Sequence, residues 1–174
     1  MDHKAMPQCA SCRTKACCSG KDCFGEAQVM EICELLAAKG YKPKGLAGPV
    51  TYHDPCHLRF AQGITEQPRQ LLSAVGELRE PEEPGRCCGG GGTFSIFHYD
   101  LSREIGAARA GMLKKTGAKI VATACPGCMA QLADMLDEEM EVCHVVDFIV
   151  KSGTDGNCVA QGDFVAAGAL SEPS

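Results

Sequence analysis

The chain has 174 residues, of which 45% are hydrophobic and 22% are charged, and its formal net charge is −5. This composition is typical of a globular domain, and it argues against a disordered chain and against a nucleic-acid-binding surface. No apolar run is long enough to span a membrane and no signal peptide is recognisable, so we expect a cytoplasmic protein.

Three segments differ in composition. Residues 1–25 are rich in cysteine, residues 26–150 alternate helix-like and strand-like stretches, and residues 151–174 are small and polar. We expect a cysteine-rich metal-binding segment, a folded domain and a flexible tail, in that order.

The first part of the central segment predicts a helix, a strand, a helix and a second short strand. Val29, Cys33 and Leu36 recur at helical spacing before Gly40, which would end that helix. The next three stretches are the strand PVTYHDP at 49–55, the helix from Pro68 to Val75 with Leu71, Leu72 and Val75 inward, and the short strand GELRE at 76–80.

The second part continues the alternation. A helix that starts near Asp100 and that Gly117 ends carries an apolar stripe: Leu101, Ile105, Ala108 and Met112. After it come the strand AKIVATA at 118–124, a helix from Pro126 striped by Met129, Leu132, Leu136 and Met140, and a strand or strand–helix junction, VCHVV, at 142–146. This order predicts an α/β fold with a small parallel sheet flanked by helices.

Cysteine is the residue type that departs most from an average composition. The 13 cysteines are an odd number in a chain without a recognisable leader, which argues against a disulfide framework. Closely spaced reduced cysteines are typical of zinc sites, iron–sulfur clusters or redox catalysis.

Five of the cysteines follow predicted strands. Cys56 follows the first strand, Cys87 and Cys88 follow the second, and Cys125 and Cys128 follow the strand at 118–124. Because the carboxyl ends of parallel strands share one edge of an open sheet, these thiols are expected to lie in one site.

The pair in CPGC lies at the start of a predicted helix. Unpaired backbone N–H groups and the helix dipole favour the thiolate of Cys125 and Cys128, which is the form that binds metal. A thioredoxin-like redox pair is the alternative, and a c-type haem site is excluded because Met129 follows Cys128.

The adjacent pair Cys87 and Cys88 runs into four glycines in GRCCGGGGTFS, residues 85–95. A disulfide between neighbours is strained, because Cα atoms about 3.8 Å apart are too close for it. In an extended segment the two sulfurs point to opposite sides, so they could bind two irons of one cluster, or one iron from two sides. Glycines would let the backbone approach such a core, and two buried structural thiols are the alternative. A phosphate loop is excluded, because neither its lysine nor its glycine spacing is present.

The stretches YHDPCHLRF, RCCGGGGTFS and TACPGC resemble the CCG cysteine-rich domain, which occurs in heterodisulfide reductase and in the iron–sulfur subunits of glycolate and lactate oxidases. In that family one Cys, Cys-Cys-Gly and Cys-x-x-Cys are separated by thirty-odd residues. Here the gaps are 57–86, or 30 residues, and 89–124, or 36 residues. The resemblance covers roughly residues 45–150.

The resemblance implies a [4Fe–4S] cluster, noncubane in the heterodisulfide reductase member, with five ligands: Cys56, Cys87, Cys88, Cys125 and Cys128. It implies an iron–sulfur redox subunit that exchanges electrons with a flavoprotein or ferredoxin-type partner, or that reduces a disulfide or thiol-linked substrate at the cluster. Members usually carry two such domains, so a two-cluster site would need a homodimer or a partner subunit here. The alternative is a non-catalytic zinc-binding module for assembly or sensing.

Two histidines flank Cys56. Either His53 or His57 could hydrogen-bond a cluster sulfide or deliver a proton, and His57 is the candidate proton donor. The alternative is a side chain that only holds the loop in place.

A second set of cysteines precedes residue 25: Cys9, Cys12, Cys17, Cys18 and Cys23. Soft ligands so close together predict a second iron–sulfur cluster or a structural zinc. The alternative is a flexible segment with free thiols.

Deletion of residues 1–25 is expected to remove a defined part of the bound metal and to leave the main visible absorption unchanged, because this site would be independent of the central cysteines. Metal analysis of the full-length and shortened proteins checks it. An unchanged metal-to-protein ratio would show that residues 1–25 bind no metal.

Overall fold

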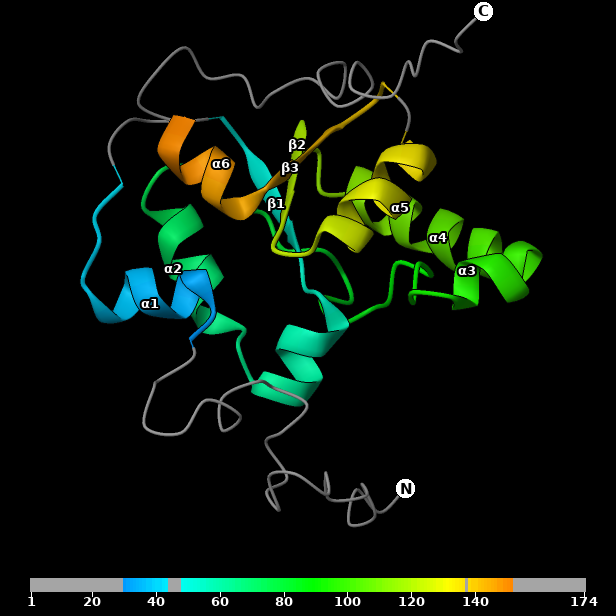
Figure 1. Ribbon diagram of the computed structural model, residues 1–174. Coiled ribbons are helices and arrows are strands. Elements are labelled where there is room, and N and C mark those ends of the chain that lie inside the picture. The colour runs from blue at the N-terminus through cyan, green and yellow to red at the C-terminus, as the bar shows by residue number, and fades with distance from the viewer. Residues whose placement is uncertain (1–29, 44–47, 137, 152–174) are drawn as a thin grey trace, which may run out of the picture.

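A computed structural model of the protein describes residues 30–43, 48–136 and 138–151. In these residues three parallel strands form one sheet in the order β1 (Val50–His53), β2 (Ile120–Thr123) and β3 (Glu141–His144). The strands end together at one edge, where His53, Thr123 and His144 lie in register (Figure 1). The predicted α/β fold with a small parallel sheet is confirmed.

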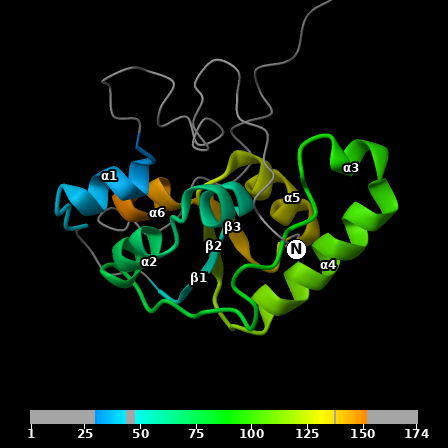
Figure 2. The same cartoon turned by 90° about the horizontal axis from the view of Figure 1, so that it is seen from below.

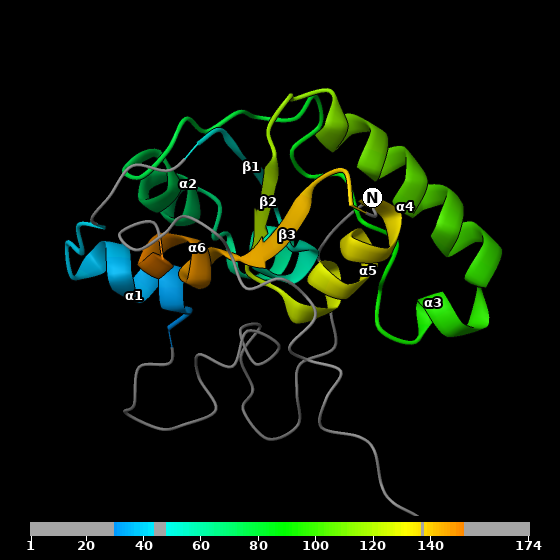
Figure 3. The same ribbon diagram turned by 90° about the horizontal axis from the view of Figure 1, so that it is seen from above.

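Helices cover both faces of the sheet (Figure 2). One face carries α1 (Ile32–Ala38), α2 (Glu66–Ser73) and α6 (Val145–Lys151), and the other carries α4 (Tyr99–Lys114) and α5 (Pro126–Leu136) (Figure 3). Two short helices belong to the connections: the π-helix η2 (His57–Gln62) after β1, and α3 (Phe94–Phe97) before α4.

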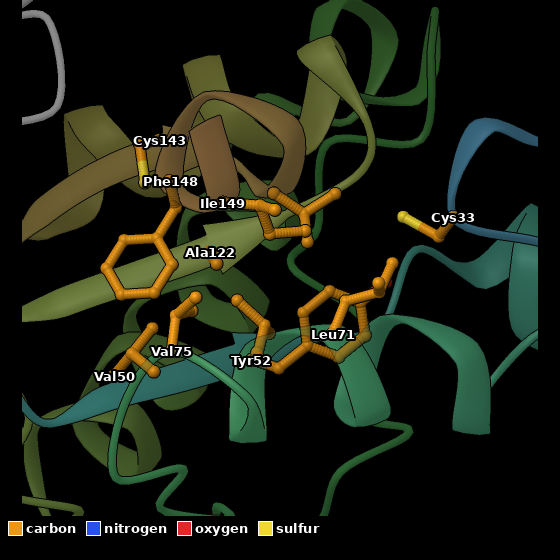
Figure 4. Packing of buried hydrophobic residues seen from close by; sticks show 11 residues of the cluster. Cys33, Val50, Tyr52, Leu71, Val75, Ala122, Cys143, Phe148 and Ile149 are labelled. Atoms are coloured by element: carbon orange, nitrogen blue, oxygen red, sulfur yellow. The ribbon is translucent and has the colours of Figure 1, made fainter. Parts of the chain in front are cut away.

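The first hydrophobic core lies between the sheet and helices α1, α2 and α6 (Figure 4). Val50 and Tyr52 of β1 are fully buried, as are Leu72 and Val75 of the α2 region. Cys33 is also fully buried here, and burial, reinforced by Glu31, raises the pKa of its thiol. This cysteine is therefore part of the core, as its position on an apolar helix face indicated.

A second hydrophobic core lies between the other face of the sheet and helices α4 and α5. Helix α4 faces it with a different side from the one that its apolar stripe indicates. Its buried residues are mostly small or polar: Ser102, Gly106, Arg109, Ala110 and Leu113. Leu101 and Ala108 of the stripe are exposed instead, and Ile105 and Met112 are only partly buried. The buried face thus lies one residue further along the chain, which is a rotation of about 100° about the helix axis.

The inward face of α4 is small and polar because it packs very close to other segments. The Ser102 hydroxyl donates a hydrogen bond to the Gly89 carbonyl oxygen (2.9 Å) and accepts one from Gln131 Nε2 (3.3 Å). A Cβ on Gly106 would lie 2.9 Å from the sulfur of Met135 on α5. Larger residues on this face would separate α4 from α5 and from the glycine-rich loop.

The expected second strand at 76–80 is reduced to a single bridge between Leu78 and Val50. Pro81 and Pro84 follow at once, and proline cannot donate a hydrogen bond to a sheet. The connection to Cys87 is therefore a loop rather than a strand.

Two predicted segments lie outside the described residues. These are the cysteine-rich segment 1–25 and, apart from Lys151 at the end of α6, the tail at 151–174. Among the described helices, none combines the length and the apolar character that crossing a membrane requires.

Gly89 and Gly92 both have a left-handed backbone, with φ of +85° and +60°, but only Gly89 is crowded. A Cβ on Gly89 would clash with the Ser102 carbonyl oxygen, whereas nothing lies within 4 Å of one on Gly92. Gly92→Ala should therefore cost only the left-handed strain, about 1–2 kcal/mol of unfolding free energy. Gly89→Ala should cost roughly 1–3 kcal/mol more, because α4 must also move. Urea unfolding of the metal-free variants measures both, and equal losses would contradict the close packing of Gly89 on α4.

Candidate metal centre

A pocket of about 510 Å³ opens at the carboxyl edge of the sheet. All five cysteines that were expected to meet line it: Cys56, Cys87, Cys88, Cys125 and Cys128. They come from three segments that are far apart in the sequence, and the parallel sheet brings two of these segments side by side. The structure thus places the five thiols in one site, while their binding of a cluster stays a prediction.

Cys56 lies two residues after Asp54, whose carboxylate is fully buried. Arg69 donates hydrogen bonds to both of its oxygens, at 2.8 and 2.7 Å, and Arg59 donates a third, at 3.1 Å. A buried carboxylate must be paired in this way to remain charged. The aspartate of the HDPC stretch thus ties the turn that carries Cys56 to helix α2 and to η2.

Cys125 and Cys128 lie at the start of α5, as CPGC predicted. Pro126 is the first helical residue, and the Met129 N–H donates to the Cys125 carbonyl oxygen (2.9 Å). Cys128 is buried in the first turn and belongs to the second core, whereas Cys125 is partly exposed. The helix start therefore presents one sulfur from the interior and one nearer the opening.

The adjacent cysteines differ in the same way. Cys88 is buried, Cys87 is exposed, and the Gly89 N–H donates to the Cys87 sulfur (3.3 Å). Gly90 and its two glycine neighbours on the C-terminal side line the pocket and leave its wall without side chains. The four glycines thus have two roles. Gly89 lets α4 pack directly against the backbone of the loop, and the other three leave space in the pocket.

The thiols affect one another's ionisation when no metal is present. The hydrogen bond to Cys128, together with burial, raises the pKa of Cys88 to about 11. The contact with Cys88, together with burial, raises the pKa of Cys87 as well. Several thiolates can therefore share this pocket only if a strong positive charge joins them, as a bound metal does.

The donor set fits a multinuclear centre better than a single ion. Sulfur ligands select soft metals such as zinc, copper(I) and iron in clusters. A structural zinc site takes four ligands in a tetrahedron, whereas five thiols line this pocket. The pocket is also far larger than the roughly 30 Å³ that one water molecule occupies in the liquid. The residues present therefore fit an iron–sulfur cluster.

The two histidines near Cys56 lie in different environments. His57 is exposed at the start of η2 and is not among the residues that line the pocket, and its role as proton donor stays a prediction. His53, at the end of β1, does line the pocket, and a ring nitrogen lies within 4.8 Å of the Cys88 and Cys128 sulfurs. Burial, and then the charge of Arg109, lower the pKa of His53 to about 3, so its ring is neutral at pH 7.

Arg109 is a residue of this site that no sequence pattern singled out. It is fully buried on α4, and its Nε donates a hydrogen bond to His53 Nδ1 (3.1 Å). The sequence did contain one signal for it. Ser102, Gly106 and Arg109 are spaced four and three residues apart, so a long charged residue shares one helical face with two small ones.

Comparison with known proteins gives a family match for the part of the chain that carries this site. Residues 50–133 match the family model of the cysteine-rich domain CCG. This range contains all five cysteines of the pocket as well as His53 and Arg109. No solved structure matches the chain.

Three relatives illustrate the similarity, and each is one subunit of an enzyme. The chain is 36% identical over 118 residues to a subunit of the fumarate reductase (CoM/CoB) of Methanothermobacter marburgensis, an alignment that covers 66% of this chain and 24% of the relative. It is 32% identical over 160 residues to a subunit of the dihydromethanophenazine:CoB–CoM heterodisulfide reductase of Methanosarcina acetivorans, covering 84% and 39%. It is 32% identical over 110 residues to the probable glycolate oxidase iron–sulfur subunit of Bacillus subtilis, covering 59% and 25%.

The chain thus spans between 24% and 39% of the length of these relatives. The segment that the family model matches contains the five cysteines of the pocket. Residues 50–133 therefore form a cysteine-rich domain of the CCG family.

Proposed function

We propose that the chain is an iron–sulfur subunit that carries electrons within an oxidoreductase. The observation that carries the proposal is the convergence of five thiols from three segments in one pocket. The relatives add support, because their names describe subunits of a fumarate reductase, a heterodisulfide reductase and a glycolate oxidase. The three enzymes are named for different reactions, so we propose that they share a redox unit with this chain rather than a substrate.

The cluster that we propose is of the [4Fe–4S] type, cubane or noncubane, and when bound it supplies one-electron redox chemistry. Cys88 and Cys128 would hold it from the interior, where both sulfurs are buried. Cys56 and Cys87 are exposed and would hold it from the side of the solvent. A site of this kind is anchored in the core and is still open to a partner on one side.

The partner is proposed to be a flavoprotein or a ferredoxin-type protein, with a second copy of this chain as the alternative. Large apolar side chains are exposed on α3 and at the start of α4, namely Ile96, Phe97, Tyr99 and Leu101. They follow Ser95, which lines the pocket. Exposed apolar side chains in one place often mark a protein contact, so they support docking of the partner beside the pocket.

Serine substitution of the five cysteines should reduce the iron content or change the visible and EPR spectra, because serine is a poorer ligand for iron than a thiolate. Cys87→Ser is the clearest variant, since Cys87 is exposed and its replacement leaves the core intact. Cys33→Ser is the matched control, because Cys33 is buried in the other core, away from the pocket.

Iron and sulfide analysis of protein purified without oxygen, followed by EPR, makes the measurement. Full iron and an unchanged spectrum in both Cys87→Ser and Cys125→Ser would refute the ligand assignment. A colourless protein that contains zinc but no sulfide would refute the cluster and favour the zinc-binding module.

We further propose that a small thiol or disulfide binds at this centre when the partner is present. Five thiols are available where a closed four-ligand cluster needs four, and two of the five are exposed at the opening. Reduction of a disulfide breaks the S–S bond and yields two thiols. It consumes two electrons, which the reduced flavoprotein or ferredoxin-type partner would supply, and two protons, for which His57 is the candidate donor.

Addition of thiols and disulfides to the oxidised protein without oxygen is expected to change its EPR signal, because a bound sulfur would alter the surroundings of the iron. The titration is run with and without the partner. A signal that no thiol or disulfide changes in either case would favour simple electron transfer over direct substrate binding.

A further inference from the structure

Arg109 is a buried cation that forms no direct ion pair with a carboxylate of the described residues. Its side chain is fully buried. Its hydrogen bonds go to neutral acceptors: Nε to His53 Nδ1 (3.1 Å), Nη1 to the Glu83 carbonyl oxygen (2.7 Å) and Nη2 to the Pro84 carbonyl oxygen (3.3 Å).

An isolated buried charge is unfavourable, and guanidinium groups do not lose their proton in proteins. Asp54, Cys88, Glu83 and Glu80 act on the charge of Arg109 without touching it, and Asp54 is already paired with Arg59 and Arg69. Further negative charge close to Arg109 would therefore stabilise it. The pocket is the place for it, because His53 contacts Arg109 and also lines the pocket. Thiolates such as Cys88, bound to iron, would carry that negative charge.

The hydrogen bond from Arg109 also determines which nitrogen of His53 carries the proton. Because Nδ1 accepts a hydrogen bond from the Arg109 Nε–H, the proton of the neutral ring lies on Nε2. A protonated Nε2 has no lone pair for a metal. His53 thus offers an N–H, rather than a lone pair, to the pocket that it lines, where one of its ring nitrogens lies within 4.8 Å of the Cys88 and Cys128 sulfurs.

We infer that Arg109 and His53 form a positioning pair that supplies the positive countercharge and an N–H donor to the sulfur-bound centre. This inference rests on the proposed cluster. A positive charge and N–H···S hydrogen bonds stabilise the more negative, reduced state, so the pair raises the reduction potential. The residue that sets the charge is remote from the cysteines in sequence and acts through His53.

Arg109→Gln is expected to lower the midpoint potential of the cluster-loaded full chain. At a fixed electrode potential the ratio of reduced to oxidised cluster should fall about tenfold. For a one-electron couple this corresponds to a midpoint potential that is lower by ~59 mV. Arg109→Lys keeps the positive charge, so its midpoint potential should be closer to that of the unmodified protein. Redox titration followed by visible absorption and EPR makes the measurement.

Arg79→Gln is the matched control. Arg79 also donates to two backbone carbonyl oxygens, of Thr116 and Gly117, but at the opposite, amino end of the sheet. Its replacement should leave the potential unchanged. A potential in Arg109→Gln equal to that of the unmodified protein, or an equal shift in Arg79→Gln, would overturn the inference.

A second pair of variants covers the case in which Arg109→Gln does not fold or does not hold the cluster. His53→Leu removes the N–H donor, whereas His53→Gln keeps an N–H at a similar position. The potential of His53→Leu should be the lower of the two, and equal potentials would overturn the inference. An unmodified protein without iron and sulfide would instead overturn the proposed function, so the two failures are distinguishable.

Discussion

The parallel pairing of β1 with β2 is the interaction on which the site depends. It places His53 opposite Thr123, and the Thr123 hydroxyl donates a hydrogen bond to the His53 carbonyl oxygen (3.0 Å) at the last position of the ladder. All four residues of β1 are buried, so a shift of register by one residue would turn every side chain to the wrong face. The turns that lead to Cys56 and Cys125 therefore leave the sheet side by side.

The third segment of the site depends on helix α4 rather than on a strand. Cys87 and Cys88 lie in a loop, and α4 holds that loop by its backbone, through Ser102 to Gly89 and through Arg109 to the carbonyl oxygens of residues 83 and 84. These contacts need small or hydrogen-bonding residues on the inward face of the helix. Helix α4 thus combines three tasks: it covers the sheet, shapes the loop and places a cation behind the pocket.

The site combines buried and exposed groups in a way that suits electron exchange. Two sulfurs and the pair His53 and Arg109 lie in the interior, where hydrogen bonds and charge act strongly because the dielectric constant is low. Cys56 and Cys87 lie at the surface. In the proposed function, the interior groups would set the redox properties of the bound cluster, and the surface side would stay within reach of the proposed partner.

The sequence by itself determined the strands β1 and β2, the start of α5 at Pro126 and the meeting of Cys56 with Cys125 and Cys128. It also predicted that Cys87 and Cys88 join them, but from a strand that the structure replaces by a loop held by α4. Short buried strands have a clear apolar signature, and the ends of parallel strands must share an edge, so no knowledge of packing was needed. Only the tertiary structure decided which face of α4 is buried, that Leu78 forms a single bridge, and that Arg109 contacts His53. Helical periodicity detects an apolar inner face, whereas α4 packs against a glycine-rich backbone and buries a charge, so its inner face carries no apolar pattern that the sequence could reveal.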